Sequence, residues 1–135
     1  MADSKLNIQL TINESGLTPD PTFISETMSI DIDGDSVSTS RKEYNAGTTK
    51  RLYKNGYVGA KDKMFYIKNI GITDFTLKEG TLGGSIGNEW GSIKSGDVML
   101  FRLPRQYDLW LANTSSSDKG IVEYSYWECK ENTIQ

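Results

Sequence analysis

The stretch that decides the fold class of this chain reads Ser95-Gly96-Asp97-Val98-Met99-Leu100-Phe101, then Tyr107-Asp108-Leu109-Trp110-Leu111, then Gly120-Ile121-Val122-Glu123-Tyr124-Ser125-Tyr126-Trp127-Glu128. Polar and glycine-containing turns separate three short runs that are rich in β-branched and aromatic side chains. No helical pattern of useful length occurs in the sequence. We therefore predict an all-β protein, an antiparallel β-sandwich of the jelly-roll type.

The first half of the chain carries the same period of two. Apolar and polar residues alternate from 6 to 12, which predicts a half-buried strand with one apolar face. Alternation resumes from 28 to 32 and ends at Asp33-Gly34, a dipeptide typical of a tight hairpin turn. We expect the chain to reverse there, with Val37 on the returning strand.

The middle of the chain adds further strands. The run from Met64 to Asn69 predicts a more completely buried strand, and the run from Ile72 to Leu77 predicts its neighbour, with Phe75 and Leu77 on one face. Eight or nine strands are expected in all, which suits a sandwich.

A chain of 135 residues is expected to form a single domain, 1–135. Its core is predicted to span about 5–129. Three segments are expected to be extended or looped and to become ordered on a partner: the N-terminus, residues 43–63, and the glycine-rich residues 79–96, with one short segment around Trp90 and Ile93.

The composition argues against catalysis. The chain contains no histidine, so it lacks the usual general base at neutral pH and the commonest transition-metal ligand. Its single cysteine, Cys129, has no histidine to activate it. We expect no enzymatic activity, no catalytic residue and no cofactor.

Composition also bears on location. The N-terminus lacks the apolar core of a signal peptide, no run approaches membrane-spanning length, and one cysteine fits a reducing compartment. A net charge of -3 gives no general attraction to nucleic acid. We expect a protein made in the cytoplasm, not secreted, with neither membrane nor nucleic acid as a partner.

Two charged segments are candidate binding sites. Acidic residues at 31, 33 and 35 resemble the start of a calcium loop, but the twelfth position is Lys42 where a bidentate glutamate would be needed. We expect no metal site, with a weak calcium-binding turn as the open alternative. The basic stretch from Lys50 to Lys63 favours a solvated face, or docking on an acidic protein surface.

Several second-half motifs resemble small structural proteins of tailed bacteriophage particles: Gly96-Asp97 before an apolar strand, the aromatic strand at 107–111, the Asn113-Thr114 loop, and Val122-Glu123-Tyr124 followed by Glu128. The resemblance implies a virion protein assembled in the host cytoplasm. It points most directly to a decoration or cement protein of the head, bound to the major capsid protein and to itself as a homotrimer. A tail or neck protein is one alternative. A carbohydrate-binding sandwich that stacks glycans on tryptophan is another.

Four aromatic or arginine side chains in expected turns or loops are predicted to contact the partner, because these residue types dominate interface energies. They are Tyr53, Tyr57, Trp90 and Arg105. Strand alternation places Trp110 on an exposed face, and it places Tyr124 and Tyr126 in the core with Val122.

Overall fold

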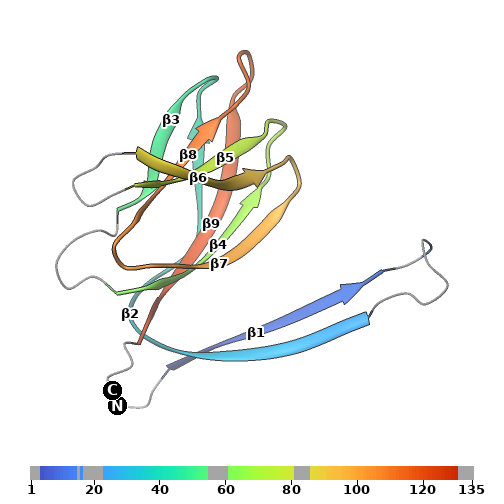
Figure 1. Cartoon of the computed structure of the whole chain (residues 1–135), viewed down its shortest axis with the longest axis vertical. Coiled ribbons are helices and arrows are strands. Elements are labelled where there is room, and N and C mark those ends of the chain that lie inside the picture. The colour runs from blue at the N-terminus through green and yellow to red at the C-terminus, as the bar shows by residue number, and fades with distance from the viewer. Residues whose placement is uncertain (1–3, 15, 17–22, 55–60, 81–85, 131–135) are drawn as a thin grey trace.

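The computed structural model describes residues 4–14, 16, 23–54, 61–80 and 86–130. It is an all-β sandwich of two antiparallel sheets, which confirms the predicted fold class (Figure 1). The described strands are β1 (Ser4–Asn13), β2 (Phe23–Tyr44), β3 (Thr49–Tyr53), β4 (Lys63–Asn69), β5 (Phe75–Gly80), β6 (Ile86–Ile93), β7 (Val98–Leu103), β8 (Asp108–Asn113) and β9 (Gly120–Cys129). No helix that could cross a membrane occurs among these described residues.

One sheet has the strand order β1-β2-β9-β4-β7, and the other has the order β3-β8-β5-β6. The core lies between the two sheets and takes its side chains from alternate positions of the strands, as the period of two predicts. Its members are Tyr44, Leu52, Phe65, Ile67, Phe75, Leu77, Ile93, Leu103, Leu109, Leu111 and Val122.

Phe65 lies at the centre of an aromatic cluster within this core. Its ring stacks with those of Tyr126 and Tyr124 at centroid distances of 5.4 and 6.1 Å, and with that of Phe101 at 6.0 Å. Aromatic rings bury large areas in such offset contacts. The core placement predicted for the two β9 tyrosines is confirmed.

The hairpin turn predicted at Asp33-Gly34 is wrong, because β2 runs through this dipeptide without reversing. The pairing of β2 with β9 is irregular there, with register shifts between Ile32 and Ser36 and again between Val37 and Ser40. Such bulges bend a strand and increase its twist. The dipeptide therefore marks a bend inside one long strand instead of the end of a strand.

The expected loops at 43–63 and 79–96 are also wrong in part. The first contains β3 and the second contains β6, whereas β1 is the strand that the alternation at 6–12 predicted. β6 is an edge strand that shows most of its residues to solvent, so its sequence lacks the apolar pattern of a buried strand. The predicted strand at 72–77 begins only at Phe75, and Ile72 lies in the preceding loop with its side chain exposed.

Trp110, predicted to be exposed, is half-buried in the four-stranded sheet. The Arg51 guanidinium lies over its indole ring, 5.7 Å from the centroid, and also pairs with Asp108 at 3.1 Å. The arginine stem and head group cover the ring because such side chains lie along apolar surfaces.

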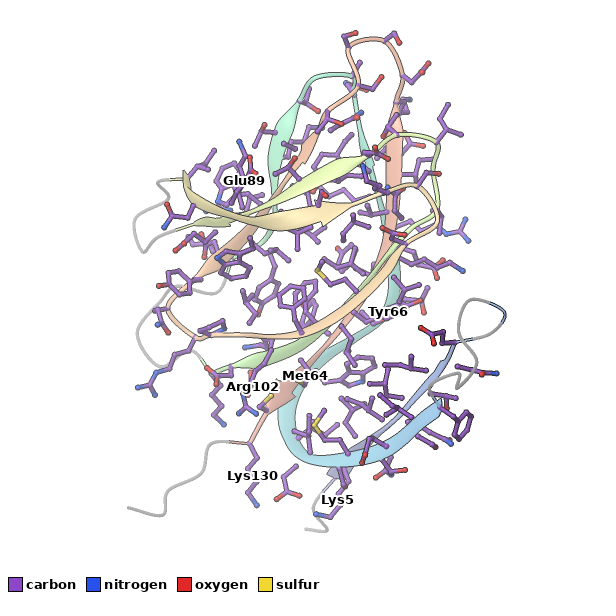
Figure 2. All side chains as sticks on the ribbon, turned by 45° about the vertical axis from the view of Figure 1, so that its right-hand side comes forward. Lys5, Met64, Tyr66, Glu89, Arg102 and Lys130 are labelled. Carbon is purple, nitrogen blue, oxygen red and sulfur yellow. The ribbon has the colours of Figure 1, made fainter. Side chains whose placement is uncertain are left out.

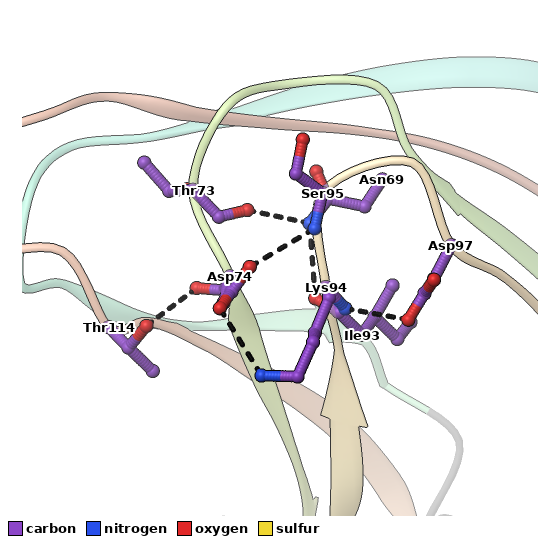
Figure 3. A network of polar contacts seen from close by, with 8 residues as sticks. All are labelled: Asn69, Thr73, Asp74, Ile93, Lys94, Ser95, Asp97 and Thr114. Atoms are coloured by element: carbon purple, nitrogen blue, oxygen red, sulfur yellow. Dashed lines mark hydrogen bonds and ion pairs between the residues drawn. The ribbon is translucent and has the colours of Figure 1, made fainter.

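The Asn69 amide and several polar contacts join the loops that flank β4, β5 and β6 (Figure 3). The Asn69 side chain is fully buried and donates to the carbonyls of Thr73 and Ile93, at 2.7 and 3.1 Å. The Asp74 carboxylate accepts from the backbone N–H of Ser95 at 3.1 Å. These bonds satisfy backbone groups that the strands leave unpaired, and they tie β4, β5 and β6 together.

Candidate interaction surface

A two-stranded arm projects from the sandwich (Figure 1). It consists of β1 and the first part of β2, residues 23–32, and we call these residues the arm. The two strands pair in an unbroken register, from Ser4 opposite Ile32 to Asn13 opposite Phe23. Beyond Ile32, β2 leaves β1 and pairs with β9, so the outer part of the arm has no third strand.

The two faces of the arm differ in polarity, because residues directly opposite in an antiparallel pair share a face. One face, which we call the apolar face, contains Leu6, Ile8, Leu10, Ile12, Ile24, Glu26, Met28, Ile30 and Ile32. The other face is mostly polar and includes the ion pair of Lys5 with Asp31. The predicted apolar stripe at 6–12 therefore exists, and β2 doubles its width.

The distal half of the apolar face is not covered by the rest of the chain's described residues. Leu10 is 53% exposed, Ile12 is 45% exposed and Met28 is 47% exposed. The expectation of a half-buried strand is therefore wrong for this half. An isolated two-stranded ribbon is at best marginally stable in water, and a contiguous exposed apolar face of this kind marks an interaction surface.

The apolar face continues into the outer face of the five-stranded sheet. Ile32, the last residue of the face, lies opposite Cys129 of β9. Cys129 and Met64 are buried but do not belong to the core between the sheets. In Figure 2, Lys5 points below the arm, whereas Met64 and Tyr66 lie above it, so the apolar side of the arm is turned toward this outer face.

The outer face carries an exposed apolar patch beyond the root of the arm. Val98 and Leu100 of β7 are 57% and 40% exposed, and they lie opposite Lys68 and Tyr66 of β4. Arg102 ends this row and pairs with Asp62 at 3.0 Å. We call the residues Tyr66, Lys68, Val98 and Leu100 the sheet patch.

A second feature lies at the open edge between β6 and β7, which are edge strands of different sheets. A groove of about 370 Å³ there is lined by Leu77, Trp90, Met99, Phe101, Arg102 and Pro104. Trp90 makes edge-to-face contacts with the rings of Phe101 and Tyr107, at 6.0 and 5.8 Å, and remains 38% exposed. The groove is mostly apolar and continues from the core.

The predicted contact residues do not form one cluster. Tyr53 packs inside, 4.6 Å from the ring of Tyr126 and beneath the Lys63 ammonium, so it serves the core. Trp90 borders the groove, and Arg105 is exposed at the loop after β7, where its backbone N–H donates to Asp62 at 2.8 Å. Tyr57 lies outside the described residues. Sequence reasoning missed the arm as a surface, although the alternation at 6–12 and 28–32 was its signal.

The charged segments serve intramolecular contacts where the structure describes them. Lys63 of the basic stretch is buried and pairs with Glu128 at 3.5 Å, and Arg51 pairs with Asp108. Asp31 pairs with Lys5, whereas the side chains of Asp33 and Asp35 lie outside the described part. Within the described residues, no group of three or more acidic or cysteine side chains could hold a metal ion.

The surroundings of Cys129 do not activate its thiol. Burial raises the pKa of its thiol, an effect that the nearby Arg102 charge opposes. A thiol with a raised pKa forms little of the reactive thiolate near neutral pH. The arrangement provides packing at the root of the arm and does not provide an activated nucleophile.

Comparison with known proteins gives a likeness of fold alone. No family model matches the chain, and no curated protein matches it. Among solved structures, a dTDP-4-dehydrorhamnose 3,5-epimerase from Elizabethkingia anophelis NUHP1 is similar with a TM-score of 0.49 and 12% sequence identity. The match covers 96% of this chain and 71% of that one.

Proposed function

We propose that this protein is a non-enzymatic structural component of a tailed-phage particle, most specifically a decoration or cement protein that stabilises the head. The observation that carries the proposal is the arm: the distal half of its apolar face is uncovered, while the sandwich behind it has its own buried core. A protein that stabilises an assembly needs a rigid body and a projecting element that becomes buried on its neighbours.

The proposed partners are the major capsid protein and further copies of this chain, as a homotrimer. Symmetric positions on a capsid let one surface be used repeatedly, and many weak contacts then add through multivalency. The absence of histidine from the chain supports a non-enzymatic role. A tail or neck position would use the same arm in the same way.

The test is mass spectrometry of purified particles, together with a cryo-EM map of the head. We expect stoichiometric amounts of the chain and density for the sandwich on the capsid surface. Particles assembled with the variant Leu10→Glu should contain much less of it than particles assembled with the control Gln9→Glu, which adds the same charge to the opposite face of β1. Absence of the wild-type chain from particles would reject the proposal, and presence only in tails would reject the head position.

A carbohydrate-binding role is the second candidate, and the groove beside Trp90 is the observation that favours it. Its lining residues are largely apolar, and an exposed indole can stack on a sugar ring. A glycan array probed with the wild-type protein and with Trp90→Ala tests this role. Specific glycan binding that is lost in Trp90→Ala would support the carbohydrate-binding role. Binding to no glycan would reject this role and leave the structural role as the one proposal.

A further inference from the structure

We propose that the apolar face of the arm docks on the sheet patch of a second copy of this chain, so that arms are exchanged between copies. The inference deepens the proposed function, on which it rests, by naming the occupant of the arm. Each copy then gives one arm and receives one. The smallest closed arrangement is a two-fold pair, and a three-fold ring satisfies the same rule.

The first argument is that one copy offers both halves of the contact. The apolar face is a flat two-stranded surface of aliphatic side chains, and the sheet patch is an exposed apolar area on an outer sheet face. Sheets pack face to face through such side chains. The distal arm residues are exposed in the single chain, and so are Val98, Leu100 and Lys68 of the sheet patch, so docking within one copy does not satisfy them.

Charge provides the second argument. Glu26 is the single charged residue on the apolar face, where it lies opposite Leu10. Lys68 is the cation of the sheet patch, and it is exposed. Among the described residues no ion pair involves either side chain, and the neighbouring Glu123 is engaged by Arg41 at 3.3 Å. A negative charge on the arm and a positive charge on the receiving face match each other across the proposed contact.

The third argument is area. The arm is ten residues long on each strand, so at about 3.4 Å per residue and about 10 Å in width its face covers on the order of 340 Å². The distal half, which the single chain leaves exposed, makes up about 170 Å² of this face. A two-fold pair in which each copy gives one arm and receives one therefore newly covers roughly 340 Å² on each copy, the size of a weak contact that repetition around an assembly would reinforce. Docking also gives the two-stranded ribbon a surface to pack against, which it needs in order to be stable.

Sedimentation over a range of concentrations tests the docking. We expect the wild-type chain, 15.1 kDa as a single copy, to form dimers or trimers. Leu10→Glu places a charge inside the contact and should weaken association at least about a hundredfold, whereas Gln9→Glu on the polar face should change it by less than about threefold. Equal effects of the two variants, or a wild-type chain that stays monomeric at its highest soluble concentration, would overturn the inference.

A charge exchange tests the direction of the contact without relying on an apolar substitution. Glu26→Lys alone and Lys68→Glu alone should each weaken association about tenfold, because each places like charges opposite one another. The double variant should recover most of the wild-type affinity. Failure of the double variant to recover any affinity would contradict docking of the arm on the sheet patch. Far-ultraviolet circular dichroism of each variant checks that the sheets are intact.

These results separate the inference from the proposed function. A pure wild-type chain that associates through its arm, but is absent from purified particles, supports the inference and rejects the particle role. A monomeric chain that is nevertheless present on particles rejects the inference and leaves the particle role in place.

Discussion

At the residue scale, a few buried polar side chains stabilise the loops between strands, and the period-two pattern of the sequence does not predict them. Asn69 satisfies two carbonyls and also accepts from the N–H of Gly71 at 3.2 Å. Asn113, at the end of β8 in the other sheet, has the same role, and its amide donates to the carbonyl of Asp118 at 2.9 Å. Each amide takes the place of backbone partners in a loop, so each fixes the path of the chain between strands.

Replacing Asn69 with alanine is expected to lower the free energy of unfolding by about 2–4 kcal/mol, since it leaves buried backbone groups without partners. Asn88 is exposed in β6 and provides the matched control, for which Asn88→Ala should change stability by less than about 0.5 kcal/mol. Urea denaturation followed by tryptophan fluorescence measures both. Similar values for the two variants would contradict a structural role for the buried amide.

The buried hydroxyl of Tyr44 is expected to lower the free energy of unfolding at alkaline pH. Burial, with a smaller contribution from Tyr124, raises the pKa of the Tyr44 hydroxyl far above its usual value near 10. The folded chain therefore keeps this proton, while the unfolded chain loses it above about pH 10, so the hydroxyl reduces stability by about 1.4 kcal/mol per pH unit above that point. Tyr44→Phe removes this contribution, and the variant should lose less stability than the wild type between pH 10 and 11.5. Parallel pH profiles of the two proteins would refute the assignment.

At the element scale, the strands divide into a cooperative body and a projecting arm. β4 and β9 lie in the middle of their sheet, with neighbours on both sides, whereas β1 is an edge strand paired only with β2. The distal arm also buries little apolar area in the single chain. Elements with few buried contacts open at lower free energies than the core strands.

Hydrogen exchange is expected to show this division. In the variant Leu10→Glu, which is expected not to associate, the paired amides of β1 should be at least about a hundredfold less protected than those of β4 and β9. In the associated wild type, β1 should gain protection while the body strands stay unchanged. Uniform protection in both samples would mean that the arm is not a separate unit.

At the scale of the whole molecule, the sandwich presents an arm and an outer sheet face on the same side, joined at the bend of β2 (Figure 2). The bend places Ile32 against Cys129, so that the outer face and the arm form one continuous apolar surface. This surface faces away from the core and includes exposed aliphatic side chains of the distal arm and of the sheet patch. An assembly role for the whole molecule is therefore proposed from this surface and not from a catalytic centre.

The whole molecule is also expected to fold without a metal. Asp31 is already engaged by Lys5, so excess calcium or EDTA should move the melting temperature by less than about 1 °C, because only a ligand that binds the folded state raises it. Differential scanning calorimetry provides the measurement. A rise of many degrees with calcium would identify the acidic residues at 31, 33 and 35 as a metal site.

The sequence by itself determined the class of fold and the faces of most strands. Alternation over Phe75–Leu77 and Val122–Tyr126 predicted their inward residues, since the period of two is a local property of the extended backbone. It also predicted the apolar stripe at 6–12, which became one side of the arm. The absence of histidine led to the expectation of a non-enzymatic chain, which stays a prediction.

Only the tertiary structure decided which face of each strand is covered by other residues. The stripe at 6–12 has the same pattern whether it packs on a core or projects, because burial depends on elements distant in the chain. Asp33-Gly34 is a dipeptide typical of a hairpin turn. After Ile32, however, β2 continues by pairing with β9, so the dipeptide forms a bend within the strand. Long-range pairing thus overrode a local signal, and the same bend exposed the surface that the proposals rest on.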